Sequence, residues 1–169
     1  MDNMKVLFIG RFQPFHKGHL KVIQDASKEY QEIIIGIGSS QYGHKSVNPF
    51  SADERKKMIE LSLKNIGIKN FKIILIPDIH NPPKWVDHVL SVISGFDVVL
   101  TNNSFTKSLF LEKGFNVKET KLYNKDNCSG KIIRKRMIED KAWENSVPEE
   151  VAIIIKKING EKRVRNLTE

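Results

Sequence analysis

The sequence predicts an α/β fold in which a doubly wound parallel sheet carries helices on both faces. Apolar runs of strand length alternate along the chain with amphipathic stretches of helical length. The strand-length runs lack a strict period of two, as is typical of parallel strands buried on both faces. The chain contains no Gly-x-x-x-x-Gly-Lys-Ser/Thr, so it is not a P-loop protein, and no Gly-x-Gly-x-x-Gly follows its first strand, which disfavours an ordinary dinucleotide-binding domain.

The chain is predicted to begin with a strand, a helix and a second strand. Val6–Ile9 is apolar, has the length of a strand and stops at a glycine. His19–Tyr30 carries its apolar residues at helical spacing, and Ile33–Ile37 is again an apolar run of strand length.

A second helix is predicted over Ala52–Ile66. Ser51 and Glu54 form a capping-box pattern at its start, and Gly67 stands where it should stop. We expect Asp53, Glu54 and Arg55 to begin and pin this helix.

The alternation continues through the middle of the chain. Phe71–Ile76, Asp97–Leu100 and Phe115–Val117 are predicted strands, and Trp85–Ile93 and Phe105–Lys113 are predicted helices between them. Gly114 stands where the last of these helices should end.

Two further helices are predicted near the C-terminus, over Lys131–Lys141 and Val147–Ile158. Ser146 is expected to cap the second of them, because Glu149 follows three residues later and Pro148 lies in the first turn.

We expect a single domain over residues 1–169, with a C-terminal helical segment at about 129–160. Gly160 is expected to end the last helix, and the charged residues 161–169 are expected to fray. The aperiodic polar segment Gly38–Phe50 follows a predicted strand, so it should lie at the ligand-binding edge of the sheet.

The composition is that of an ordinary globular protein, with 40% hydrophobic and 28% charged residues among 169. No apolar run approaches the roughly 20 residues that span a bilayer, and Met1–Met4 does not open a signal peptide. The single cysteine, Cys128, excludes an internal disulfide and is typical of the reducing cytoplasm, where we expect the protein to reside. The net charge of +8 favours anionic partners.

An anion site is predicted where the first strand passes into the first helix. Gly10 and Gly18 let the backbone approach a ligand, and a helix start adds the positive end of its dipole. Arg11, His16 and His19 supply the donor groups that phosphate chemistry needs. Two satisfied surface histidines are the plain alternative for His16 and His19, and half a metal site is another. A zinc site needs three or four ligands. The remaining candidates do not cluster with the pair, and so we predict no protein metal site; they are His44, His80, His88 and Cys128.

A second anion site is predicted at the start of the helix that follows Ser129. The pair Ser129–Gly130 leads directly into the basic run Lys131–Arg136, in which Lys131 and Arg134 share one helix face. A basic run alone is a weak signal and would also suit a solvated face or a nucleic-acid patch. Aromatic residues are only 8% of the chain and do not interleave with the run, so nucleic acid is disfavoured as a partner.

Both sites carry recognisable motifs. Gly-Arg-Phe-Gln-Pro-Phe-His-Lys-Gly-His at 10–19 and Ser-Gly-Lys-Ile-Ile-Arg at 129–134 resemble the two signature motifs of the nucleotidylyltransferase superfamily. Nearly end to end, the chain is similar to the archaeal-type nicotinamide mononucleotide adenylyltransferases of that superfamily. The middle segments that carry this closer resemblance are Ile37–Gln41, Asn48–Arg55, Ile76–Ile79, Trp85-Val86 and Phe96–Val99.

The resemblance implies a Rossmann-like nucleotidylyltransferase architecture and the transfer of AMP from ATP to nicotinamide mononucleotide, giving NAD and pyrophosphate. It also implies Mg²⁺ delivered with ATP, without dedicated protein ligands, and a homo-oligomer, commonly a hexamer. The family usually has a threonine where this chain has Lys131, so either that ammonium or the Ser129 hydroxyl takes over the phosphate contact. The implied ATP-binding residues are Gly10, Arg11, Phe12, Gln13, His16, Gly18, His19, Ser129, Lys131, Arg134 and Arg136, and the implied nicotinamide-nucleotide residues are Asn48, Phe50, Trp85 and Asn102.

The chemistry of the motifs agrees with such a reaction. The attacking 5′-phosphate has a second pKa of about 6 and is largely a dianion at neutral pH, so no general base is required. Catalysis should then depend on positioning and on charge neutralisation, for which we expect His16, His19, Arg11 and Arg134 to be responsible.

Three alternatives stay open from the sequence. The first is an enzyme of the same superfamily with another acceptor, such as flavin mononucleotide, phosphopantetheine or a sugar-alcohol phosphate. The second is a basic nucleic-acid-binding protein, and the third is a catalytically inactive nucleotide sensor, against which the intact His16, His19 and Arg134 argue.

Overall fold

The computed structural model describes residues 2–167 and contains a five-stranded, wholly parallel sheet with the order β3-β2-β1-β4-β5. The central strand β1 (Asp2–Gly10) pairs with β2 (Tyr30–Ile37) on one side and with β4 (Val98–Leu100) on the other. The edge strands are β3 (Phe71–Leu75) and β5 (Asn116–Lys118). The predicted α/β class and parallel sheet are therefore confirmed.

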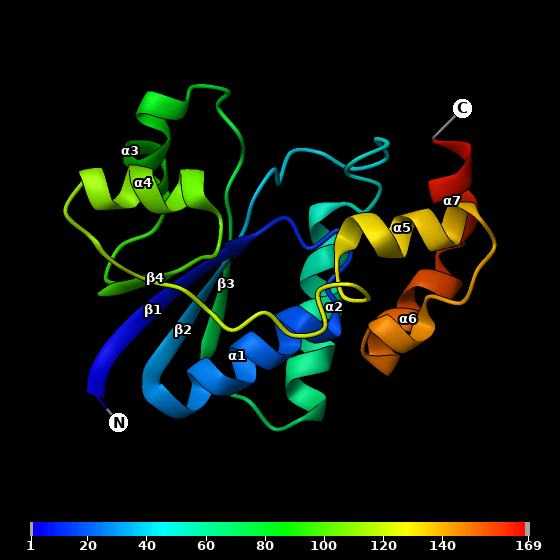
Figure 1. Cartoon of the computed structure of the whole chain (residues 1–169), viewed down its shortest axis with the longest axis horizontal. Coiled ribbons are helices and arrows are strands. Elements are labelled where there is room, and N and C mark those ends of the chain that lie inside the picture. The colour runs from blue at the N-terminus through cyan, green and yellow to red at the C-terminus, as the bar shows by residue number, and fades with distance from the viewer. Residues whose placement is uncertain (1, 168–169) are drawn as a thin grey trace.

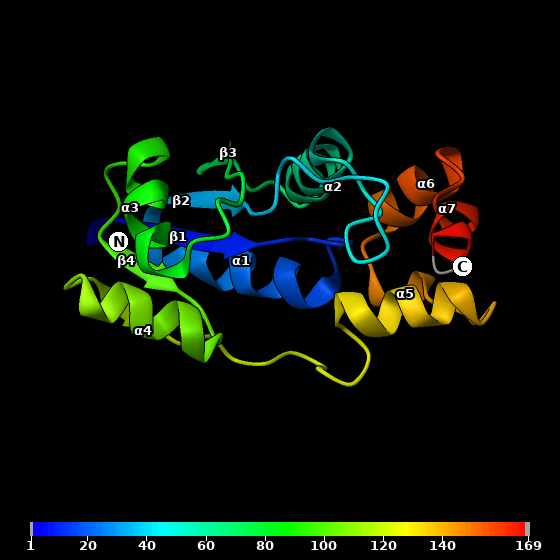
Figure 2. The same cartoon turned by 90° about the horizontal axis from the view of Figure 1, so that it is seen from above.

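Helices cover both faces of this sheet (Figures 1 and 2). On one face, α1 (Lys17–Glu29) and α2 (Ala52–Asn65) pack with strand residues such as Val6 in one hydrophobic cluster. On the other, α3 (Pro82–Val92) and α4 (Ser104–Glu112) pack with residues such as Leu7 in a second cluster. Successive strand residues thus point to opposite layers, which explains why the runs are apolar without alternation.

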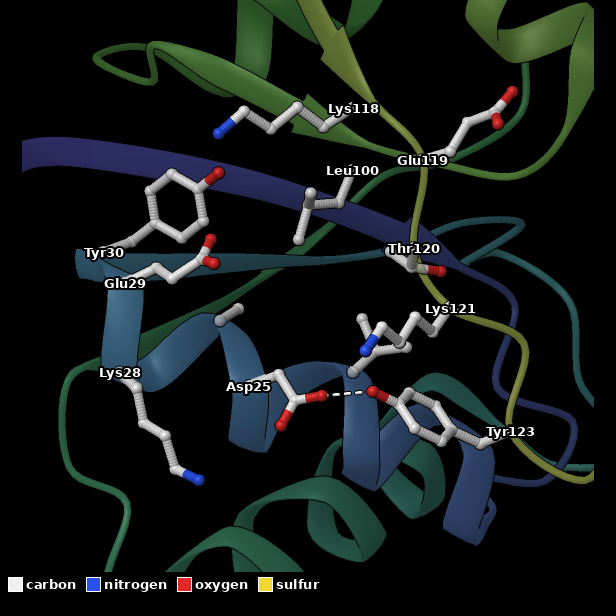
Figure 3. A pocket seen from close by; sticks show the side chains of 12 residues that line it. Asp25, Lys28, Glu29, Tyr30, Leu100, Lys118, Glu119, Thr120, Lys121 and Tyr123 are labelled. Atoms are coloured by element: carbon white, nitrogen blue, oxygen red, sulfur yellow. Dashed lines mark hydrogen bonds between the residues drawn. The ribbon is translucent and has the colours of Figure 1, made fainter.

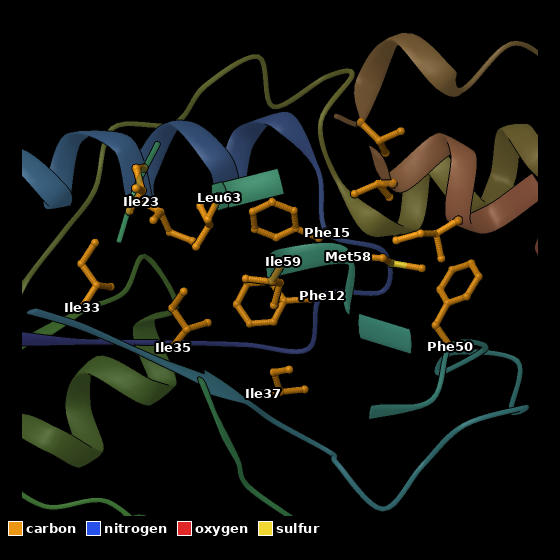
Figure 4. Close-up of a cluster of buried hydrophobic side chains, with 14 of the residues drawn as sticks. Phe12, Phe15, Ile23, Ile33, Ile35, Ile37, Phe50, Met58, Ile59 and Leu63 are labelled. Carbon is orange, nitrogen blue, oxygen red and sulfur yellow. The ribbon is translucent and has the colours of Figure 1, made fainter. Parts of the chain in front are cut away.

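Three helices follow the sheet and pack beside α2: α5 (Gly130–Ile138), α6 (Glu149–Lys157) and α7 (Gly160–Asn166). They share the larger hydrophobic cluster with α1, α2 and the sheet. Figure 4 shows part of this cluster, running from Ile33 and Ile35 of the sheet past Phe12 and Phe15 to Met58 and Phe50 near the C-terminal helices.

The predicted capping of α6 by Ser146 is wrong. Ser146 ends a short 3₁₀ turn, Glu144–Ser146, and its hydroxyl accepts a hydrogen bond from Arg136 at 3.1 Å. The helix begins only at Glu149, after Pro148, and no side chain caps it. The hydrogen bond that Arg136 of α5 donates to the buried Ser146 hydroxyl therefore outweighs the local capping pattern.

The prediction that residues 161–169 fray is also wrong for the part that the structure describes, because α7 extends to Asn166; residues 168 and 169 lie outside the described range. Val164 is buried in the large cluster, and the Arg163 guanidinium holds both carboxylate oxygens of Glu54, at 2.7 and 3.0 Å. Gly160 begins this helix, and Asn159 adopts the left-handed conformation at the junction after α6.

Other elements differ from prediction mainly in their limits. β1 begins at Asp2 and β2 at Tyr30, a few residues earlier than their apolar runs. The capping box of Ser51 and Glu54 at the start of α2 is confirmed. Among the described residues, no helix is both long enough and apolar enough to cross a membrane.

Candidate active site

Most side chains of the loop between β1 and α1 are buried, from Phe12 to His16, while Arg11 is exposed. Phe12 has a left-handed backbone and a ring that is only 2% exposed. The buried Gln13 side chain accepts from the backbone N–H of Phe50 and donates to its carbonyl, both at 2.9 Å. Phe12 and Gln13 were expected in the ATP site, and their buried side chains leave the backbone as the part of these residues that a ligand can reach. The two residues shape the loop, and the loop presents its backbone.

His16 and His19 form a reciprocal cap at the start of α1. The backbone N–H of His19 donates to Nδ1 of His16 at 3.3 Å, and the backbone N–H of His16 donates to Nδ1 of His19 at 3.2 Å. Because each Nδ1 accepts, the proton of each neutral ring belongs on Nε2. Both imidazoles can therefore donate a hydrogen bond away from the helix start.

Both rings are held in the neutral form. Burial lowers the pKa of His16 to about 4. Burial, followed by the neighbouring His16, lowers the pKa of His19 well below its usual value. The rings stack with centroids 3.6 Å apart, an arrangement in which two imidazolium charges would repel each other. At neutral pH the pair is therefore uncharged and can donate hydrogen bonds from Nε2–H.

The second motif, at residues 129–134, lies against the first, at residues 10–19. Nη1 of Arg134, in α5, donates to the backbone carbonyl of Gln13 at 2.6 Å. A Cβ atom at Gly130 would lie 2.9 Å from the same carbonyl oxygen, so only a glycine lets α5 start this close to the loop. A Cβ atom at Gly18 would lie 3.4 Å from that of Cys128. The structure therefore brings the two sequence motifs into one site.

A cavity of about 220 Å³ lies where these segments meet, and both histidines line it. None of the lining residues that the structure describes is acidic, and two of them are lysines. These residues are Phe8, Ile9, Gly10, His16, Gly18, His19, Val22, Thr101, Asn102, Thr120, Lys121, Leu122, Tyr123, Lys125 and Cys128. Hydrogen-bond donors without carboxylates make the cavity suited to an anion.

Two arginines from the motifs reinforce this character. Burial and the nearby guanidinium of Arg11 lower the pKa of Arg134, which shows that the two cations are within electrostatic reach of each other. Arg11 itself is exposed. Two positive side chains this close favour a bound anion between them.

The remaining residues of the second motif have distinct places. Ser129 caps α5, its Oγ accepting from the N–H of Ile132 at 3.2 Å. Lys131 is exposed on the first turn of α5. Arg136 donates to Asn127 Oδ1 at 2.6 Å and to Ser146 Oγ at 3.1 Å, so it supports the loops on either side of the helix.

The four residues expected to bind the nicotinamide nucleotide do not lie together. Trp85 lines a separate cavity of about 260 Å³ with Asp78, His80, Asn81, Pro82, Phe105 and Thr106. Asn102 lines the histidine cavity instead, with its side chain bonded to Thr120 at 2.7 and 2.8 Å. The ring of Phe50 is fully buried in the large hydrophobic cluster and cannot reach a ligand, which corrects that expectation.

Asn48 is the fourth of these candidates. It is 6% exposed, and its backbone pairs with that of Lys45 at 3.0 and 3.2 Å. Its side-chain oxygen is buried with no hydrogen-bond partner among the described residues. A buried amide oxygen without a hydrogen-bond donor costs free energy, so this position favours a donor that the described residues do not supply.

Sequence reasoning missed a set of contacts between the loops after β2 and β3. Ser39 Oγ donates to Asp78 Oδ2 at 2.6 Å, and the Gln41 side chain exchanges two 2.9 Å bonds with the backbone of Asp78. Tyr42 Oη lies 2.6 Å from His80 Nε2. The polar loops that follow two adjacent parallel strands were the available signal, because such loops meet at one edge of the sheet. We call this set of contacts the loop clasp.

A larger groove of about 530 Å³ adjoins the histidine cavity along α1 (Figure 3). The two share Val22, Thr120, Lys121 and Tyr123 in their lining, and Tyr123 donates a hydrogen bond to Asp25 between them. Neither His16 nor His19 is among the described residues that line the groove, and the lining mixes acidic and basic side chains. We therefore place the candidate site in the smaller cavity.

Comparisons with known proteins agree with the geometry. A model of the family described as cytidylyltransferase-like matches residues 7–136. A protein of Methanococcus maripaludis named nicotinamide-nucleotide adenylyltransferase is 48% identical over 166 residues, which cover 98% of this chain and 96% of that protein. A protein of the same name from Archaeoglobus fulgidus is 45% identical over 98% of each chain.

Solved structures show the same fold. A bifunctional NMN adenylyltransferase/ADP ribose pyrophosphatase of Francisella tularensis, complexed with AMP and a manganese ion, superposes with a TM-score of 0.79 at 25% identity. The match covers 97% of this chain, which spans about half (52%) of that longer protein. A nicotinate-nucleotide adenylyltransferase candidate from Vibrio parahaemolyticus has a TM-score of 0.66 at 16% identity and covers 96% of both chains.

Proposed function

Because this chain belongs to the cytidylyltransferase-like family and is related over its full length to nicotinamide-nucleotide adenylyltransferases, we propose that it transfers AMP from ATP to nicotinamide mononucleotide, forming NAD and pyrophosphate. One observation supports this most directly. The paired imidazoles at the start of α1 and the guanidinium of Arg134 converge on the same loop, beside a cavity whose described lining residues include no carboxylate.

The proposed mechanism is charge neutralisation around an in-line displacement. The 5′-phosphate of the acceptor attacks the α-phosphorus of ATP, the bond to the bridging oxygen breaks, and pyrophosphate leaves with the electron pair. His16 and His19 donate from Nε2 to the phosphate oxygens, while Arg11 and Arg134 attract the same anion from two sides. Ser129, Lys131 and the N–H groups at the start of α5 face the triphosphate in this proposal.

A divalent cation fits this site only as a companion of the nucleotide. Among the described residues, no group of three or more His, Cys, Asp or Glu side chains could hold a metal ion. The site offers cations and N–H donors, so Mg²⁺ would be held by phosphate oxygens and water. Its contribution when bound is to neutralise charge on the triphosphate.

The acceptor base is proposed to occupy the cavity beside Trp85. The indole packs edge to face on Phe110 at 5.8 Å, which fixes the ring, and it forms part of the cavity wall. A flat, electron-poor pyridinium ring suits an aromatic wall with a carboxylate, Asp78, nearby. Asn48 does not line this cavity, and its buried oxygen is therefore not assigned to the acceptor.

An acceptor screen tests the proposed function. The protein is incubated with ATP, Mg²⁺ and one acceptor at a time: nicotinamide mononucleotide, flavin mononucleotide or phosphopantetheine, and the product is identified by mass. We expect NAD and pyrophosphate in equal amounts. A flavin dinucleotide or dephospho-coenzyme A, without NAD, would show that the acceptor is wrong, and salt-sensitive binding to arbitrary duplex without turnover would favour a nucleic-acid protein.

We also propose that the protein works in the cytoplasm as a homo-oligomer. Support for assembly comes from large apolar side chains that are exposed on α4 and α6, among them Phe105 at 56% and Ile153 at 59%.

A further inference from the structure

Arg55 is a fully buried arginine near the start of α2, with 0% exposure. Its guanidinium has five N–H groups, and all five donate to backbone carbonyls at distances between 2.8 and 3.2 Å. The five accepting carbonyls belong to Arg11, Gly38, Ser39, Tyr42 and Ser51.

The contacts of Arg55 extend beyond α2 to the two loops that follow β1 and β2. Only the Ser51 carbonyl belongs to the cap of α2, and the other four belong to the loops after β1 and β2. Burial, followed by the charge of Arg11, lowers the pKa of Arg55 to about 10, so the guanidinium stays charged at neutral pH. Arg55 forms no ion pair within 4 Å among the described residues, so its desolvation is compensated by the five carbonyl dipoles together with the more distant charge of Glu54.

The carbonyl contacts link Arg55 to both halves of the candidate active site. Through the carbonyl of Arg11 it holds the end of β1, from which the phosphate-binding loop starts. Through Ser39 and Tyr42 it holds the residues that make the loop clasp with Asp78 and His80. Asp78 and His80 in turn line the cavity beside Trp85.

We propose that Arg55 is a positioning residue that fixes the distance between the phosphate-binding loop and the acceptor cavity. This inference rests on the proposed function, in which a phosphate of one nucleotide must attack another nucleotide in line. Such a reaction depends steeply on placement, and an error of about 1 Å can cost on the order of a hundredfold in rate. Each nucleotide still finds its own contacts when the two subsites shift relative to each other, so binding should suffer less than turnover.

Arg55→Lys tests this proposal. A lysine has three N–H groups in place of five, so at least two carbonyls lose their donor while the positive charge remains. We expect kcat for NAD formation to fall by about 30- to 100-fold, with the KM values for ATP and nicotinamide mononucleotide changing by less than about threefold. Rates are measured well below the unfolding midpoint of each variant.

Arg163→Lys is the matched control. Arg163 also donates to a backbone carbonyl, that of Pro49 at 3.1 Å near the end of the loop after β2, and it pairs with Glu54 of α2, but it bonds neither to the phosphate-binding loop nor to a residue of the loop clasp. We expect this variant to lose stability with a kcat within about twofold of the wild type. An equal loss of kcat in Arg163→Lys would reduce the role of Arg55 to stability and overturn the proposal.

Gln41→Ala provides a second test if Arg55→Lys does not fold. Gln41 is exposed, and its removal deletes the two bonds that join the clasp to the Asp78 backbone. We expect a lower kcat with unchanged ATP binding by calorimetry. An unchanged kcat, or a loss confined to ATP affinity, would contradict the proposal. Failure of the wild type to make NAD in the same assay would refute the proposed function itself.

Discussion

At the scale of single residues, the histidine pair shows how one side chain serves two purposes. Nδ1 of each ring caps the helix, and this leaves Nε2–H for the ligand. The sequence indicated that His16 and His19 belong to an anion site, because they follow a strand, a glycine and an arginine. The mutual cap could not be foreseen, because histidine is not among the usual N-cap residues.

Replacing His19 separates these two roles. His19→Ala should lower kcat on the order of a hundredfold, because an Nε2–H bond to developing charge is lost, with a much smaller effect on ATP affinity. His19→Asn keeps an acceptor near the Nδ1 position and should fold stably with the same low kcat. His19→Gln keeps a donor near Nε2 and should recover part of the rate while losing about 1 kcal/mol of stability with the cap. Equal losses of kcat and affinity in His19→Ala would indicate a binding role only.

The pH dependence of the free energy of unfolding should reflect that His16 is neutral in the folded protein. Its folded pKa of about 4 lies below the ordinary value of 6.5, so between these values the unfolded chain binds more protons. The contribution is complete above about pH 6.5 and is lost as the pH falls toward 4; between pH 7.5 and 5.0 it amounts to roughly 2 kcal/mol. Urea unfolding at both pH values should show a smaller acid loss in His16→Asn than in the wild type. The exposed His44 provides the control, since His44→Gln should keep the full loss.

At the scale of elements, the loops after β2 and β3 lack regular structure but are joined by specific side-chain contacts. The sequence predicted Gly38–Phe50 at the ligand-binding edge because it follows a strand, and in the structure the segment begins at the carboxyl end of β2. It could not show that Ser39, Gln41 and Tyr42 contact residues some 37–39 positions away, because such pairings depend on which strands become neighbours. Asn48, Phe50, Trp85 and Asn102 were grouped by resemblance, and the structure separates them for the same reason.

The acceptor cavity beside Trp85 predicts a choice between two related substrates. Its lining contains Asp78 and no lysine or arginine among the described residues. The carboxylate of nicotinic acid mononucleotide would meet a like charge there, whereas a carboxamide would not. We expect kcat/KM for the acid to be at least about tenfold lower, equivalent to roughly 1.4 kcal/mol. Steady-state rates with both substrates measure this, and Asp78→Asn should narrow the gap. Equal kcat/KM values for the two substrates would mean that the nicotinamide ring binds outside this cavity.

At the scale of the whole molecule, the parallel sheet and its two helical layers were predictable because burial on both faces leaves a direct mark on composition, whereas the order of the strands was not predicted. The structure of the C-terminal third was less predictable from the sequence. Ser146 offered a capping pattern that Arg136 overrides, and the charged tail forms α7 because Arg163 and Val164 find partners far away in sequence. Local signals describe a segment, and the packing of distant segments decides between the conformations it can adopt.

The Glu54–Arg163 pair connects that C-terminal third to α2, and Glu54→Gln tests the connection. The two side chains are only 20% and 17% exposed, so removing one charge leaves the other half-solvated. We expect a loss of about 2 kcal/mol in the free energy of unfolding by urea, with kcat unchanged at moderate temperature. A neutral effect on stability would mean that α7 is held by Val164 and its apolar neighbours alone.

The contact between Arg134 and Gln13 spans 121 positions of sequence. During synthesis on the ribosome, a growing chain displays its paired histidines long before the arginine that completes their site has been added. The site that we propose for ATP is therefore complete only once α5 has been added, and a chain that stops upstream of α5 lacks both this contact and part of the large hydrophobic cluster.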